Sequence, residues 1–100
     1  MLLTKADRKR LPKLYEQDGD PKAKAYVKFF NPCGAGTWYA TEFDGEDTFF
    51  GWVDLGFGPG HSELGYFSLK ELVSFKGPLG IGIERDRHFS PTLLSEITAP

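Results

Sequence analysis

Cysteine, histidine and long apolar segments are scarce in this sequence. One cysteine, Cys33, and two histidines occur among 100 residues. A single thiol excludes a disulfide within the chain and a metal site built from several thiolates, and two histidines alone do not close a zinc site. The opening apolar stretch ends at Leu3, which is too short for a secretory signal or a membrane span. We therefore expect a cytoplasmic protein that binds no metal and has no membrane segment.

Basic residues are absent from the middle of the chain. Residues 31–69 contain six acidic side chains and neither lysine nor arginine, whereas residues 1–30 contain eight basic and four acidic ones. The net charge of −2 therefore combines a basic beginning with an acidic centre. Such an asymmetry can orient a binding partner.

No sequence motif indicates catalysis or a cofactor. Cys33 lies in a Pro-Cys-Gly loop without an adjacent base, and a nucleophilic thiol needs one. The glycine-rich loops lack the Lys-Ser/Thr ending of a phosphate-binding loop and the dinucleotide-binding fingerprint. We therefore expect a non-enzymatic protein without a cofactor. An enzyme is an alternative hypothesis. Its active site would lie among five polar residues that would have to meet in one pocket, namely Glu42, Asp44, His61, Glu63 and Arg85.

Short helices are expected at three places. Thr4 and Ser68 each precede an acidic residue by three positions, which is the pattern of a capping box. Ser90-Pro91 is typical of a helix start, because proline is favoured at the first helical position. The predicted helices span residues 5–11, 69 to about 75 and 91 to about 97.

The strongest pattern is a β-hairpin. Two aromatic-rich runs, residues 37–43 and 48–55, flank the turn residues 44–47. A two-residue turn would pair two acids, Glu42 and Asp47, which is destabilising, whereas a four-residue loop avoids this contact. Alternation alone leaves open which face of the hairpin is the core. Both registers place the same residues on one face, namely Tyr39, Thr41, Phe43, Thr48, Phe50 and Trp52.

The order of these elements predicts an α+β fold. The connections between strands are too short for parallel crossovers, so the sheet should be mainly antiparallel. We expect a single domain, residues 1–100, with about four to five strands and short helices at the N-terminus, after the central strands and at the C-terminus. Strands or extended segments are predicted over residues 25–30, 37–43, 48–55, 63–67 and 79–89.

The turn acids and the neighbouring tryptophans suggest a docking site. Exposed polar loops on a rigid sheet often carry recognition, and an uncovered aromatic surface is typical of protein interfaces. We expect a monomer or homodimer that binds a protein partner, with DNA-handling proteins among the candidates. The residues expected to contact this partner are Trp38, Glu42, Asp44, Glu46, Asp47 and Trp52.

A second hypothesis is nucleic-acid binding through the predicted first helix. Lysine and arginine side chains bind phosphates, and several of them fall close together there. The aromatic hairpin carries only acids, which disfavours it as a surface for stacking bases. The residues of this alternative are Lys5, Arg8, Lys9, Arg10 and Lys13.

Several segments resemble a bacterial family known as domain of unknown function 2958. They are AYVKFF at residues 25–30, TWYATEFDGEDTFFG at 37–51, and residues 3–14, 63–69, 77–80 and 83–86. The resemblance covers almost the whole chain and implies a small bacterial protein carried on plasmids, phages or integrating elements, beside replication, transfer or antirestriction genes. It implies no catalytic residue or cofactor. We therefore expect an accessory protein of a mobile element, with counter-defence as one such role.

Overall fold

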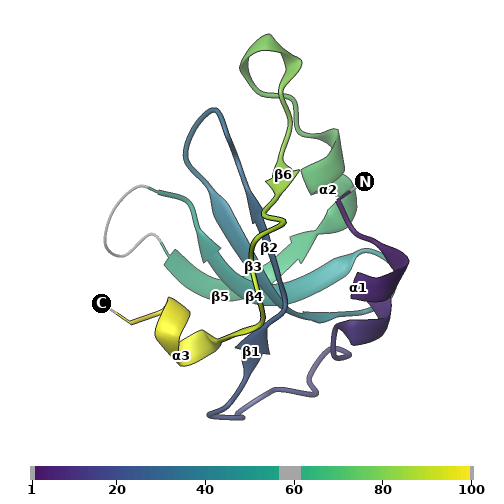
Figure 1. Ribbon diagram of the computed structural model, residues 1–100, viewed down its shortest axis with the longest axis vertical. Helices are drawn as coiled ribbons and strands as arrows, with labels where there is room; N and C mark the ends of the chain where they lie inside the picture. The colour runs from purple at the N-terminus through teal and green to yellow at the C-terminus, as the bar shows by residue number, and fades with distance from the viewer. Residues whose placement is uncertain (1, 57–61, 100) are drawn as a thin grey trace.

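The computed structural model describes residues 2–56 and 62–99 and has the expected α+β architecture (Figure 1). A five-stranded antiparallel sheet has the strand order β5-β4-β3-β2-β6, and a separate two-stranded sheet pairs β1 with β7. The elements are α1 (Lys5–Arg10), β1 (Lys24–Ala25), β2 (Val27–Phe30), β3 (Thr37–Phe43), β4 (Thr48–Asp54), β5 (Ser62–Ser68), α2 (Leu69–Ser74), the 3-10 turn η1 (Pro78–Gly80), β6 (Glu84–Arg85), β7 (Thr92–Leu93) and α3 (Leu94–Ile97).

Both helices predicted from capping residues are confirmed. At the start of α1, the Thr4 hydroxyl accepts the backbone N–H of Asp7 at 3.1 Å, and the Asp7 carboxylate accepts the N–H of Thr4 at 2.9 Å. At the start of α2, the Ser68 hydroxyl accepts the N–H of Glu71 at 3.2 Å. These local contacts satisfy N–H groups that the first turn of a helix leaves without partners.

The closing helix is shorter than predicted. It begins at Leu94 and not at Pro91, because the backbone of Thr92 and Leu93 pairs with β1. The N–H of Leu94 also donates to the carbonyl of Ala23 at 2.8 Å. Pairing with a distant segment therefore holds extended a stretch whose local sequence is typical of a helix start.

A β-bulge at Thr41 gives the hairpin two registers. On the side of the bulge away from the turn, at residues 37–40, β3 and β4 keep the register of the predicted four-residue loop. Beyond the bulge, Phe43 lies opposite Phe49 and not Thr48, and the Thr41 hydroxyl donates to the carbonyl of Phe50 at 2.9 Å. The prediction that Phe43 shares a face with Phe50 is wrong, because one extra residue reverses the alternation of side chains.

The core lies on the sheet face that carries Phe29, Ala40 and Phe49. The ring centroid of Phe49 lies 5.5 Å from that of Phe29 and 4.4 Å from that of Phe43. Trp38, one of the residues expected to contact a partner, packs against this core. Side chains from the N-terminal segment, α2 and the segment before β6 cover it, namely Leu3, Leu11, Leu72 and Ile83.

The opposite face of the sheet is covered in part. The segment that follows β6 runs in front of the sheet in Figure 1, and the Phe89 ring lies 5.8 Å from that of Tyr39. On the edge strand β5, Leu64 and Tyr66 stay exposed, at 46% and 56%. This face carries a row of large side chains, namely Tyr39, Phe50, Trp52, Leu64 and Tyr66.

Candidate functional site

Glu42 does not lie at an exposed hairpin tip. Its side chain is buried, and its two carboxylate oxygens accept the backbone N–H groups of Tyr15 and Gln17, each at 2.8 Å. The bulge at Thr41 sets the face on which Glu42 lies. The expectation that Glu42 is available to a partner is therefore wrong, because this carboxylate holds the segment after α1 against the sheet.

The acids of the hairpin tip, residues 44–47, stabilise local structure. Asp44 Oδ1 accepts the backbone N–H groups of Glu46, Asp47 and Thr48 at 2.8–3.0 Å. These bonds, chiefly the one from Glu46, lower the pKa of Asp44. Within the described ranges, the exposed Glu46 side chain has no hydrogen-bond partner. Glu46 is therefore the tip acid that keeps its carboxylate directed to solvent.

Asp47 connects the tip to the start of α2. Its carboxylate accepts the backbone N–H of Lys70 at 2.7 Å and the hydroxyl of Ser68 at 2.8 Å. The bond from Lys70, followed by that from Ser68, lowers the pKa of Asp47. The carboxylate thus lies at the helix N-terminus, where a negative charge is favourable.

Replacing Asp47 with asparagine is expected to weaken the acid sensitivity of the fold. The pKa of Asp47 is lowered from 3.8, so its contribution to stability is present above about pH 4 and is lost as the pH falls through the lowered value. The urea midpoint, measured by circular dichroism from about pH 5 to about pH 2, should fall less steeply in Asp47→Asn than in the wild type. Glu63→Gln, at an exposed position on β5, is the control. An equal slope in Asp47→Asn and the wild type would contradict this role.

The basic helix α1 packs beside the acidic tip. Arg8 Nη1 donates to the carbonyl of Gly45 at 3.0 Å, and the Arg8 guanidinium lies 5.5 Å from the centroid of the Phe43 ring. The two charged regions that the sequence separates are therefore neighbours in space. Within the part of the chain that the structure describes, three exposed lysines of this region have no ion pair, namely Lys5, Lys9 and Lys13.

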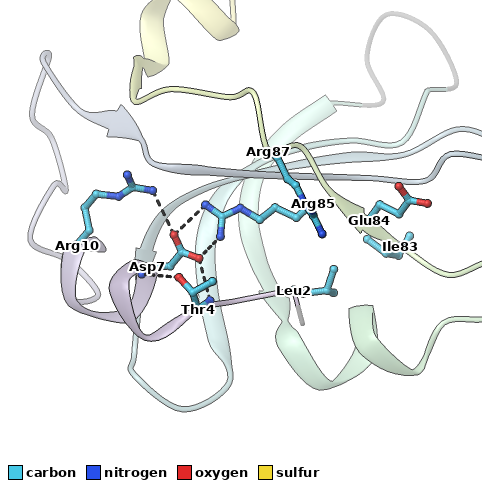
Figure 2. Close-up of a pocket in the computed structure, with 8 residues that line it drawn as sticks. All are labelled: Leu2, Thr4, Asp7, Arg10, Ile83, Glu84, Arg85 and Arg87. Carbon is cyan, nitrogen blue, oxygen red and sulfur yellow. Dashed lines mark hydrogen bonds and ion pairs between the residues drawn. The ribbon is translucent and has the colours of Figure 1, made fainter.

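Two arginines converge on the buried carboxylate of Asp7 (Figure 2). Arg85 binds both oxygens, with 2.8 Å between Nη2 and Oδ1, and Arg10 Nη2 lies 3.3 Å from Oδ1. Burial, together with the nearby charge of Arg87, lowers the pKa of Arg85. These residues line an open pocket of about 600 Å³ that also includes Glu84. The ion pair joins α1 to β6, and we interpret it as structural.

A second cavity lies beside the uncovered part of the sheet. It has a volume of about 320 Å³ and lies between Tyr15, residues 17–20, strands β3, β4 and β5, and Leu94. The hydroxyls of Tyr15 and Tyr66 are 3.2 Å apart at this cavity, and the ring centroids of Phe50 and Tyr66 are 5.0 Å apart. Tyr15 is 67% exposed and has a φ of +73°, in a region that bulky residues rarely adopt.

We call Tyr15, Trp52, Leu64 and Tyr66 the open patch. Trp52 is half-buried and lies opposite Leu64 across β4 and β5. Of the six residues expected to contact a partner, Trp52 is the one that lies on this patch, whereas Trp38 lies on the core face.

The comparison with known families shows to which family the chain belongs. The family model described as "Protein of unknown function (DUF2958)" matches residues 2–98. The chain belongs to the DUF2958 family. No curated protein and no solved structure matches this sequence. The match confirms the resemblance seen in the sequence, and it spans both cavities and the hairpin tip of this DUF2958 protein.

Among the residues that the structure describes, the polar side chains considered for an enzyme site lie in different parts of the fold. Glu42 contacts the segment at Tyr15, whereas Arg85 binds Asp7 beside α1. Glu63 is exposed on β5, and His61 lies outside the described residues. Over residues 2–56 and 62–99, no cluster of histidine, cysteine or acidic side chains has a metal-binding arrangement. The helices in these same ranges are too short or too polar to cross a bilayer.

Sequence reasoning missed Tyr15 and Asp7 as organising residues. Tyr15 lies in a loop without periodicity, and its position depends on Glu42, which is 27 residues away. The local pattern predicts Asp7 as part of a helix cap, which the structure confirms, but it does not indicate the pairing with Arg85, which spans 78 residues. The signal available for the open patch was the alternation of Leu64 and Tyr66 with smaller or charged residues along β5.

Proposed function

We propose that this DUF2958 protein is a non-enzymatic accessory protein of a bacterial mobile element and that it binds a protein partner through the open patch. The observation that carries this proposal is the exposure of Tyr15, Leu64 and Tyr66 along and beside an edge strand. Clustered exposed apolar side chains mark interaction sites, and tyrosine and tryptophan are enriched at protein interfaces.

This proposal keeps Trp52 of the hairpin as a contact residue and moves the rest of the contact from the acidic tip to β5 and Tyr15. The carboxylates of Glu42, Asp44 and Asp47 accept internal hydrogen bonds, and a partner would have to replace them. The setting on a mobile element follows from the resemblance described above. A DNA-handling host protein as the partner, and hence counter-defence, fits that setting.

Replacing Leu64 and Tyr66 together with serine is expected to abolish capture of the partner from a lysate of the host bacterium. Both side chains contribute exposed apolar surface that binding would bury, and such central contacts carry most of the binding energy. Affinity capture followed by mass spectrometry compares this variant with the wild type. Val73→Ser on α2, where Val73 is 57% exposed, is the matched control.

The outcomes separate the two proposed contact regions. Loss of capture in the Leu64→Ser, Tyr66→Ser variant, with an unchanged urea midpoint, supports the open patch. Unchanged capture would refute it. Loss of capture in Glu46→Lys alone would return the contact to the hairpin tip.

Nucleic-acid binding is the second candidate function. It is favoured by the exposure of Lys5, Lys9 and Lys13 without ion pairs among the described residues. Arg8 and Arg10 are instead engaged with Gly45 and Asp7. Retardation of DNA that weakens with salt and disappears when the three lysines are replaced with glutamine would favour this candidate.

A further inference from the structure

The cavity beside Tyr15 and Tyr66 combines aromatic walls with acidic groups. Its volume of about 320 Å³ is at the lower end of the range of ligand pockets, about 300–1,000 Å³. Apolar atoms of Phe50, Leu64 and Leu94 line it. A cavity of this size and composition suits one long side chain with an apolar stem.

The charge at this cavity is negative. Asp18, Asp20 and Glu42 line it, and none of its lining residues is a lysine or an arginine. Glu42 is hydrogen-bonded to two backbone N–H groups, and Asp20 Oδ1 accepts the N–H of Lys22 at 2.8 Å. The pKa of Tyr66 is raised first by the hydrogen bond to Tyr15, then by partial burial and by the charge of Tyr15, with smaller contributions from the charges of Glu42 and Asp18. A positively charged group is therefore favoured at the hydroxyls.

The aromatic side chains of the cavity are held in place. The Glu42 carboxylate fixes the backbone on both sides of Glu16 and keeps Tyr15 at its positive φ. The Phe50 ring lies edge-on against that of Tyr66. A strained backbone that is locked by a buried group provides a preorganised binding surface, which lowers the entropy lost on binding.

We infer that this cavity receives an arginine side chain of the protein partner, with the guanidinium between the tyrosine rings and the carboxylates of Asp18 and Asp20. The inference rests on the proposed function, since it names the chemistry of the partner at the open patch. Arginine fits better than lysine, because its planar, weakly hydrated cation stacks on aromatic rings and forms several hydrogen bonds at once. Its aliphatic stem would lie along Leu64 and Leu94.

The test uses N-acetyl-arginine amide as the probe and its uncharged isostere, N-acetyl-citrulline amide, as the control ligand. Titration of the ¹⁵N-labelled chain is followed by NMR. We expect the arginine derivative to shift the amide signals of residues 15–20 and 64–66. The citrulline derivative, or the variant Asp18→Asn, Asp20→Asn, should weaken binding about tenfold. Asparagine can still accept the hydrogen bond from Lys22, so the loop should remain folded.

Glu16→Gln is the matched control variant, because Glu16 is an exposed acid of the same loop that lies outside the cavity lining. It should bind the arginine derivative with unchanged affinity. Equal shifts with the arginine and citrulline derivatives, or equal affinity in the double asparagine variant, would overturn the inference. The proposed function fails separately, if the Leu64→Ser, Tyr66→Ser variant still captures the partner. In that case the wild-type chain can still bind the arginine derivative.

Discussion

Replacing Asp7 with asparagine is expected to lower the free energy of unfolding by about 3–5 kcal/mol. Asp7 is buried, and its carboxylate is the ion-pair partner of Arg85, whose side chain is only 20% exposed. Removing one charge of a buried pair leaves the other without compensation in a poorly solvated position. The loss is a large part of the stability of a small domain, which is about 5–15 kcal/mol.

Urea unfolding followed by tryptophan fluorescence measures this effect, and thermal unfolding should show a fall of roughly 4–8 °C per kcal/mol. Glu84→Gln is the matched control, because Glu84 is an exposed acid that lines the same pocket. It should change the free energy of unfolding by no more than about 0.5 kcal/mol. Similar midpoints for the two variants would show that the ion pair contributes little.

Replacing Gly51 with alanine is expected to destabilise the protein by about 3 kcal/mol. A Cβ atom at Gly51 would lie 1.8 Å from the carbonyl oxygen of Tyr39 and 3.2 Å from the Cα of Ala40. Both neighbours are backbone atoms of β3, beside the bulge, so they cannot move aside as a flexible side chain would. The strands would have to separate at the centre of the sheet.

Gly65→Ala is the control for this prediction. Gly65 lies directly opposite Gly51 on β5, and a Cβ atom there would meet nothing within 4 Å. Alanine at this position should be neutral or should stabilise the fold by a few tenths of a kcal/mol, because it restricts the unfolded chain. Equal urea midpoints for the two alanine variants would contradict the close approach of β3 to Gly51.

The parts of the fold that depend on neighbouring residues were predictable from the sequence. The caps of α1 and α2 form between residues three positions apart, and the alternation of the hairpin places Trp38 and Trp52 on opposite faces as expected. Short-range hydrogen bonds and strand periodicity fix these features.

The sequence-based predictions that the structure contradicts failed because of contacts between residues far apart in the chain. The bulge at Thr41 moves the side chains of Glu42 and Phe43 to the opposite faces of the sheet. Phe43 thereby joins the core, where its ring stacks on that of Phe49. The shortened α3 results from pairing with β1, about 70 residues earlier in the chain. The candidate site is affected most, because the turn acids are expected to contact a partner, whereas Asp44 and Asp47 accept hydrogen bonds from the backbone. The order of residues in the sequence shows that these acids are near one another, but not which N–H groups they accept.

The ion pair between Asp7 and Arg85 has a consequence for biosynthesis. Helix α1 is translated before β6, so the side chain that secures its buried acid arrives 78 residues later. Strand β2 likewise waits for β6 before its outer edge is paired. The nascent chain can form the central hairpin before β6 is made, but α1 becomes anchored only after Arg85 has been translated, so this docking step is a late event in the folding of the domain.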